Sequence, residues 1–265
     1  MKIKIAIIFA LFFFAPIESK AQHKVFIDEN MNNIDSLQYI NKCKVLVLKC
    51  LKYKTDSLEV NKVLYNYSFG KITPTQYRQL KRLLIQNADT LINSNAVILI
   101  NYRDSLYNFE ANKKNYDLHV LKHDSVHHKK LTVKNFETNR KNWIKKQNKC
   151  IKKLAKKYNT KTFYVYKYDF GALKDDEALN WIKDRGIFKN MFFKIQFNYN
   201  YLIIKPDGEY FLCGNHFSNI NLKFLLKNSN WSKVKLDLKN SYISNSLDGI
   251  GTFSEVNGLH IEHCF

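Results

Sequence analysis

The sequence predicts an α/β protein with a mixed central sheet flanked by helices and a β-rich α+β N-terminal lobe. In residues 140–158 an apolar stripe led by Trp143 lies opposite lysines with a period of about 3.6 residues, typical of an amphipathic helix. Residues 162–168 are rich in β-branched and aromatic side chains, which favour a strand. The continuous apolar run 96–100 predicts a central strand covered on both faces.

Residues 1–21 have the pattern of a secretory signal peptide. Lys2 and Lys4 precede an apolar stretch at 5–14, and Ser19-Lys20-Ala21 forms a small-x-small cleavage site. No later segment is apolar enough to cross a membrane, since a spanning helix needs about 20 apolar residues. We therefore expect export to the periplasm or the extracellular space, and not an integral membrane protein.

Residues 22–95 predict the N-terminal lobe. A strand at 25–28 precedes a helix that starts near Ile34 and ends near Cys43. A hairpin with arms 45–54 and 58–69 follows, and its second arm slips in phase near 61–62, which predicts a β-bulge. The lobe closes with a helix that Thr73 caps and Pro74 begins.

Residues 96–230 predict the main α/β domain. After the helix at 140–158 and the strand at 162–168, a helix is expected at 175–185, whereas 187–197 fits either a strand or a helix. Lys205-Pro206-Asp207-Gly208 predicts a tight turn between strands 201–204 and 209–213, and Ser218 opens a last helix. Residues 231–265 read as a C-terminal extension of strand-like pieces.

The five cysteines are odd in number, so at least one is expected to be free. No C-x-x-C motif is present, which excludes a dithiol redox site of that type. If residues 45–50 are extended, the Cα atoms of Cys43 and Cys50 are about 20 Å apart, beyond the roughly 7 Å that a disulfide tolerates. These two cysteines are then expected to need other partners.

The chain has a formal net charge of +20, which favours anionic partners. The charge is segregated only on the helix at 140–158, where lysines occupy the side opposite the apolar stripe. The anion-binding residues predicted on this side are Lys145, Lys149, Lys152, Lys153 and Lys156. A solvated helix surface is the alternative interpretation, and a composition rich in Lys, Asn, Ile, Tyr and Phe is also typical of an AT-biased genome.

From Ala96 to Lys227 the element order resembles the thioredoxin-like fold. The 140–168 unit looks like its first crossover, and Tyr201-Leu202-Ile203-Ile204-Lys205-Pro206-Asp207-Gly208-Glu209-Tyr210 like its closing hairpin. Redox-active members carry reactive cysteine where Asn101-Tyr102-Arg103-Asp104-Ser105 stands here, and a cis-proline where Asn198-Tyr199-Asn200 stands. The resemblance, which covers about half of the chain, therefore implies a domain without oxidoreductase or peroxidase chemistry.

Two patterns suggest chemistry in the segment 103–128. His119, His123 and His127 repeat every four residues, so on a helix they would share one face within reach of a divalent metal. Ser105 beside Asp104 and Arg103 follows the run 96–100, and open α/β sheets bind ligands beyond the carboxyl ends of their strands. No G-x-S-x-G, H-E-x-x-H or P-loop motif accompanies these residues, so no catalytic residue is assigned.

The sequence thus predicts an exported, redox-inactive thioredoxin-like protein that acts in binding or assembly in the cell envelope or outside the cell. No cofactor is predicted. The partner would be an anionic surface or polymer, or another envelope protein. The alternatives are a metal-dependent or serine-type hydrolase that uses residues 103–128, and an anion-binding protein that uses the helix at 140–158.

Overall fold

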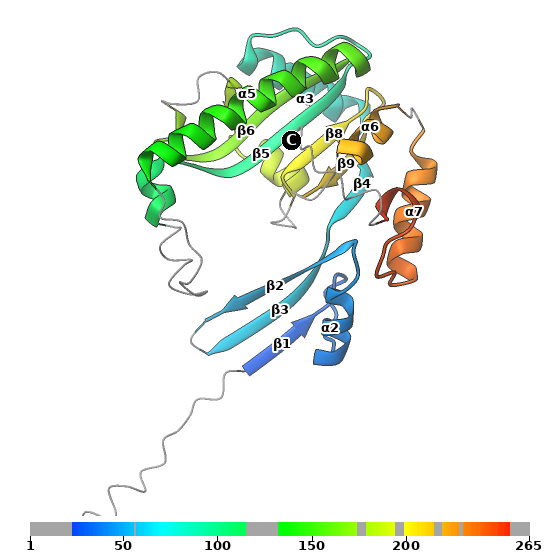
Figure 1. Ribbon diagram of the computed structural model, residues 1–265. Helices are drawn as coiled ribbons and strands as arrows, with labels where there is room; N and C mark the ends of the chain where they lie inside the picture. The colour runs from blue at the N-terminus through cyan, green and yellow to red at the C-terminus, as the bar shows by residue number, and fades with distance from the viewer. Residues whose placement is uncertain are drawn as a thin grey trace, which may run out of the picture. The chain divides into compact units, whose positions relative to one another are not determined.

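The computed structural model describes residues 23–55, 57–114, 132–173, 179–193, 199–214, 219–227 and 230–254. They form two compact units (Figure 1): a smaller one that runs up to Cys43 and from Cys50 to Leu64, and a larger one of 44–49 and the chain from Tyr65. The larger unit therefore also contains residues 65–95, which were expected in the N-terminal lobe. The signal peptide expected at 1–21 lies outside the described residues.

The smaller unit is a three-stranded sheet with one helix. Its strand order is β1-β3-β2, and β1 pairs in parallel with β3. Helix α2 is capped by Asp35, whose carboxylate accepts the Gln38 backbone N–H while the Gln38 side chain accepts the Asp35 N–H. The bounds are β1 His23–Ile27, α2 Ser36–Cys43, β2 Leu48–Lys54 and β3 Leu58–Tyr65.

The expectation that Cys43 and Cys50 need other partners is wrong. They form a disulfide with their Cα atoms 5.5 Å apart. The reason is local: residues 45–48 turn, with the Leu48 N–H donating to the Val45 carbonyl, so the intervening chain is not extended. Cys213 is free and buried, as the odd count predicts, and Cys150 is also disulfide-bonded.

The bulge predicted near 61–62 is not found against β1, because the register of β1 with β3 continues without interruption from Leu58 to Lys62. Buried polar side chains also account for the phase slip. Glu59 and Asn61 are buried at positions that alternate with Val63, so polar side chains occupy the inward face. Hydrogen bonds from Lys52 first, and then from Asn61 and Lys54, lower the pKa of the Glu59 carboxyl to about 2 against the opposing effect of burial.

The larger unit is built on a six-stranded mixed sheet of order β4-β9-β8-β5-β6-β7. Strands β5, β6 and β7 are parallel, whereas β8 is antiparallel to β5 and to β9, and β4 is antiparallel to β9. The central position expected for the run 96–100 is confirmed in β5. The strand bounds are β4 Tyr67–Lys71, β5 Val97–Tyr107, β6 Thr160–Phe170, β7 Trp181–Lys183, β8 Tyr201–Ile204 and β9 Glu209–Cys213.

The hairpin expected around Pro206 is confirmed. The Gly208 N–H donates to the Lys205 carbonyl and the Lys205 N–H to the Glu209 carbonyl, and Gly208 has a φ of +83°. A tight turn that ends on a left-handed residue is a common three-residue hairpin, and glycine takes that conformation without strain. This turn sets the antiparallel register of β8 with β9.

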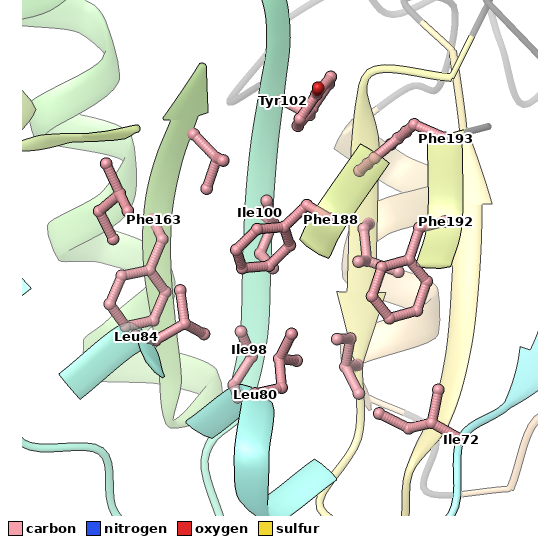
Figure 2. Close-up of a cluster of buried hydrophobic side chains, with 14 of the residues drawn as sticks. Ile72, Leu80, Leu84, Ile98, Ile100, Tyr102, Phe163, Phe188, Phe192 and Phe193 are labelled. Carbon is pink, nitrogen blue, oxygen red and sulfur yellow. The ribbon is translucent and has the colours of Figure 1, made fainter. Parts of the chain in front are cut away.

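One face of the sheet is covered by α3 (Pro74–Ala88) and the helical segment that contains η3 (Lys189–Phe193), a π-helical turn. Figure 2 shows Leu80 of α3 beside Ile98, Leu84 of α3 beside Phe163, and Phe188 beside Ile100, in a continuous apolar cluster. The predicted cap of α3 is confirmed as a capping box between Thr73 and Gln76, with Pro74 at the first turn.

On the opposite face the described part of the chain places α5 (Val133–Tyr158), α6 (Asn219–Lys227) and α7 (Ser232–Ile243). Helix α5 packs on β6 with Leu154 and Gln147 buried (Figure 1). At the other end of this face, Trp231 packs against Phe69 and donates its indole N–H to the Leu225 carbonyl of α6. A short 3₁₀ turn, η4 (Gly251–Phe253), lies against α7.

Two expected elements differ from the structure. Residues 181–183, expected within a helix, form strand β7 because they pair with Tyr164, Val165 and Tyr166 of β6. Residues 232–243, expected to be strand-like, form α7, which buries Val234, Asp237, Leu238 and Ser241 at helical spacing. The ambiguous stretch after Gly186 is helical through Phe193, and Asp184 accepts the N–H groups of Gly186, Phe188 and Lys189 at its start.

Candidate functional site

A cleft of about 440 Å³ opens over the carboxyl-terminal half of β5, beneath the amino-terminal part of α5. It lies within the larger unit, on the α5 face of the sheet. Its walls come from β5, from residue 112, from α5, from residue 172 and from β7. The described lining residues are Arg103, Ser105, Leu106, Tyr107, Asn112, Phe136, Asn139, Arg140, Trp143, Ala172 and Trp181.

Two aromatic rings of the cleft lining, those of Trp143 and Trp181, are in edge-to-face contact with Tyr164 of β6. The ring centroids of Trp143 and Tyr164 are 6.2 Å apart, and those of Tyr164 and Trp181 are 5.2 Å apart. Tyr164 also donates its hydroxyl hydrogen to the Gln147 side chain at 3.2 Å, in a buried position under α5. These contacts hold both tryptophans in defined orientations against the sheet.

Arg140 is held in place at the cleft by contacts of its own. Its guanidinium donates to the Ala172 carbonyl and lies over the Phe136 ring, 5.8 Å from the centroid. Such a cation–π contact is typical of arginine at half-buried sites. Arg140 therefore ties the beginning of α5 to the loop after β6, and adds positive charge to the wall.

Arg103 is the second cleft arginine and projects from β5. Its charge lowers the pKa values of the Tyr164 and Tyr201 hydroxyls, against the larger effect of burial, which raises both. The guanidinium is therefore close to these two phenols. No carboxylate in the described part of the chain forms an ion pair with Arg103, although its side chain is half-buried.

The remaining polar groups of the described lining are neutral: the Ser105 hydroxyl and the amides of Asn112 and Asn139. No aspartate, glutamate or histidine is among the described lining residues. The nearby tyrosines do not supply a base, because burial raises the pKa values of Tyr164 and Tyr166. The arrangement can bind and orient a ligand, but the described residues offer no general acid–base pair.

The structure separates the serine and the aspartate named from the sequence. Both lie within β5, and neighbouring residues of a strand point to opposite faces. Ser105 and Arg103 line the cleft, whereas Asp104 forms an ion pair with Lys189 of η3 on the other face. Asp104 therefore cannot orient a base for Ser105, and the residues of this motif do not form a triad.

The lysine side of the helix at 140–158 is confirmed as exposed. Of the expected apolar stripe, Leu154 is buried, Trp143, Ile144, Cys150 and Ile151 are partly buried, and Ala155 is exposed. The helix carries one acidic residue, Glu137, in its first turns. The exposed anion-binding candidates are Lys145, Lys149, Lys152, Lys153 and Lys156.

The histidines expected to bind a metal, His119, His123 and His127, lie outside the described residues. Among the residues that are described, no group of three or more His, Cys, Asp or Glu side chains could hold a metal ion. Cys213 is not placed for redox chemistry, since burial raises the pKa of its thiol well above the usual range and the thiolate is the reactive form.

Several cleft residues were not recognised as site residues from the sequence. Trp143 was interpreted as the first residue of an apolar helix stripe, Trp181 lies within the helix expected at 175–185, and Tyr107, Asn112, Asn139 and Arg140 were not singled out. The sequence contains one weak indication of a site, because Phe136, Arg140 and Trp143 lie close together near the start of the helix. Their contact with β5 and β7 depends on tertiary structure, which no local sequence pattern predicts.

Comparison of the chain with protein-family models, with curated protein sequences and with solved structures finds no match. Within the described residues, no helix is both long enough and apolar enough to span a membrane. Functional inference therefore depends on the geometry of the chain itself.

Proposed function

We propose that this protein is an exported binding protein whose larger unit has a redox-inactive, thioredoxin-like arrangement and binds its ligand in the cleft over β5. The observation that carries the proposal is the cleft itself: two arginines, two tryptophans and neutral amide groups, without an acid–base pair in the described lining. Clefts of this size, largely apolar with a few polar groups, are typical small-ligand sites.

Strand order and direction support the fold part of the proposal. In a thioredoxin-like domain the first two strands are parallel neighbours, the third lies antiparallel beside the first, and the fourth forms a hairpin with the third. Strands β5, β6, β8 and β9 have this arrangement, with α5 as the crossover between the first two. The cleft lies where β5 and the start of α5 meet.

Two features support export. The pattern of residues 1–21 is that of a signal peptide, and the Cys43–Cys50 disulfide is of a kind that persists in oxidising compartments. The absence of a C-x-x-C motif supports binding in place of thiol exchange. An insulin-reduction assay with turnover above a heat-killed control would contradict the redox-inactive part of the proposal.

The binding part is tested by a thermal-shift screen of the mature protein against a library of anionic, neutral and cationic small molecules. Asn139→Trp places a large ring at the cleft from an exposed position of α5, and Asn142→Trp makes the same change three residues along, outside the described lining. Ligands should raise the melting temperature of wild type and Asn142→Trp but not of Asn139→Trp. Equal shifts in both variants would place binding elsewhere.

The exposed lysines of α5 support a second candidate function, the binding of an anionic surface or polymer. Near an anionic membrane each lysine contributes about 1 kcal/mol of attraction, and nucleic acid binding would weaken steeply with salt. Few aromatic residues lie among these lysines, which favours a generic anionic surface over stacked bases. The hydrolase alternative has less support, since Ser105 has no base among the described lining residues.

A further inference from the structure

We infer that the cleft takes a small organic carboxylate with a flat, apolar body, whose carboxylate pairs with Arg103 while the body lies against Trp143 and Trp181. This inference rests on the proposed binding function of the cleft. It adds the chemical class of the ligand.

The sign of the ligand charge follows from the lining. Arg103 and Arg140 are the charged groups of the described lining, and Arg103 forms no ion pair with a carboxylate among the described residues. A cationic ligand would meet the like charge of Arg103 in a half-enclosed space, where screening by water is weaker than in bulk. An anion would instead neutralise that charge.

The two arginines have different roles. Arg140 already donates to the Ala172 carbonyl and stacks on Phe136, so its position is fixed by the protein. Arg103 forms no ion pair within the described residues, and its neighbours Tyr164 and Tyr201 are phenols whose pKa values burial raises. A half-buried arginine without a carboxylate partner is a ready site for a planar anion, because its guanidinium fork matches a carboxylate with two parallel hydrogen bonds.

The number of charges on the ligand is limited because the protein holds Arg140 through the Ala172 carbonyl and the Phe136 ring, which leaves Arg103 as the charged group that pairs with the ligand. The other polar groups of the described lining, Ser105, Asn112 and Asn139, are uncharged. These can donate single hydrogen bonds, but they do not offset the several charges of a nucleotide polyphosphate. A monoanion with one or two further hydrogen-bond acceptors fits this set better.

The body of the ligand is set by the two tryptophans of the lining and by the space. Trp143 and Trp181 both contact Tyr164, whose ring lies between them on the sheet. Offset or edge-to-face contact with such rings favours a flat apolar group. The volume of about 440 Å³ admits a one- or two-ring compound and falls in the range of ordinary small-ligand pockets.

The test uses the whole mature protein and three probes: 2-naphthoate, the neutral amide 2-naphthamide, and acetate. Calorimetry and tryptophan fluorescence at pH 7 report binding. The naphthoate should bind about tenfold or more tightly than the amide, which corresponds to one charge-assisted pair. Acetate should bind weakest, because it lacks the flat body. An amide that binds as well as the naphthoate, or naphthoate that fails to bind at millimolar concentration, would overturn the assignment.

Variants locate the carboxylate. Arg103→Gln should weaken naphthoate binding about tenfold and leave amide binding nearly unchanged, and Arg103→Lys, which keeps the charge but not the fork, should fall between. Arg82→Gln, an exposed arginine of α3 outside the described lining, is the matched control and should bind like wild type. Wild-type affinity in a folded Arg103→Gln protein would contradict the inference.

The two proposals fail separately. If the thermal-shift screen finds neutral or cationic ligands that Asn139→Trp blocks and Asn142→Trp does not, the cleft is a binding site and the carboxylate assignment is wrong. If naphthoate binds with equal affinity to both tryptophan variants and to Arg103→Gln, the anion lies elsewhere and the carboxylate inference fails. The cleft proposal itself fails if every ligand of the screen stabilises both tryptophan variants equally.

Discussion

The two faces of the six-stranded sheet differ in the side chains that the same strands send to them. Toward α3 and η3 the strands present Ile98, Ile100, Phe163, Val165 and Leu202, all buried in one apolar cluster (Figure 2). Toward α5 they present Asn101, Arg103, Tyr164, Tyr166 and Tyr201. The first face is closed and stabilises the fold, whereas the second carries hydrogen-bonding groups and leaves a cleft.

The same contrast runs along β5. From Ile98 to Ile100 the side chains are 0% exposed, whereas beyond Tyr102 the strand becomes partly exposed and forms the floor of the cleft. A single strand thus anchors the core with one half and the candidate site with the other. A site built on a rigid strand holds its groups more precisely than a site on a loop.

The largest effect is expected on the closed face. Phe188→Ala removes a ring with no exposed surface from the apolar cluster, and should lower the free energy of unfolding by about 3 to 5 kcal/mol. Urea unfolding followed by circular dichroism measures it. Ile187→Ala, at a 42% exposed neighbour, is the control and should cost much less. Equal losses in the two variants would show that the face is not packed as described.

Leu154→Ala tests how α5 is attached to the other face. Leu154 is 3% exposed on a helix that packs on β6, so its loss should cost about 2 to 5 kcal/mol. Leu236→Ala on α7, where the side chain is 55% exposed, is a matched leucine deletion that should cost under about 1 kcal/mol. A small effect at Leu154 would mean that α5 is held by its polar contacts.

Strong local patterns predicted elements correctly, and non-local pairings did not follow from them. The apolar run 96–100, the Thr73 cap before Pro74 and the turn ending at Gly208 each carry their cause in a few adjacent residues. By contrast, residues 67–69 were predicted as the end of the hairpin arm 58–69, but they belong to β4, which pairs with β9, far along the chain. Its partner was set by tertiary structure.

For the candidate site too, features that depend on local sequence patterns were predicted, and features that depend on tertiary contacts were not. The exposed lysines of α5 follow from helical periodicity alone, and the structure has them on the solvent side. The cleft joins β5, α5 and β7, and β7 was expected to be helical, so the meeting of Arg103 with Trp143 and Trp181 could not be anticipated. Three residues of edge strand carry too little periodicity to be distinguished from a helix.

A smaller loss of stability is expected when one buried tyrosine hydroxyl is removed from either face of the sheet. Tyr164→Phe removes the hydrogen bond to Gln147 at 3.2 Å, and should cost about 1 kcal/mol. Tyr102→Phe removes a longer contact of 3.4 Å to Asp184, whose carboxylate also accepts three backbone N–H groups, so it should cost less. Thermal unfolding of both variants checks the order. The reverse order would show that the polar network on the α5 face is weak.

The smallest effect on stability is expected at the exposed lysines of α5. Changing four of them to glutamine should alter the free energy of unfolding by no more than about 1 kcal/mol, because exposed substitutions away from special features cost little. If these lysines bind an anionic surface, retention of the variant on heparin or anionic liposomes should fall while its melting temperature is kept. The four positions are Lys145, Lys149, Lys152 and Lys156.

A control with the same loss of charge separates the position of the lysines from the total charge of the protein. Wild-type retention should weaken steeply with salt in either case, since attraction between exposed charges is screened within about 10 Å at 0.1 M. If the anionic surface binds specifically to the lysines of α5, only the α5 variant should lose most of its retention. Equal losses in both variants would reduce the lysines to a contribution to net charge, and unfolding of the α5 variant would contradict their exposure. The four control lysines, exposed and outside α5, are Lys71, Lys227, Lys233 and Lys239.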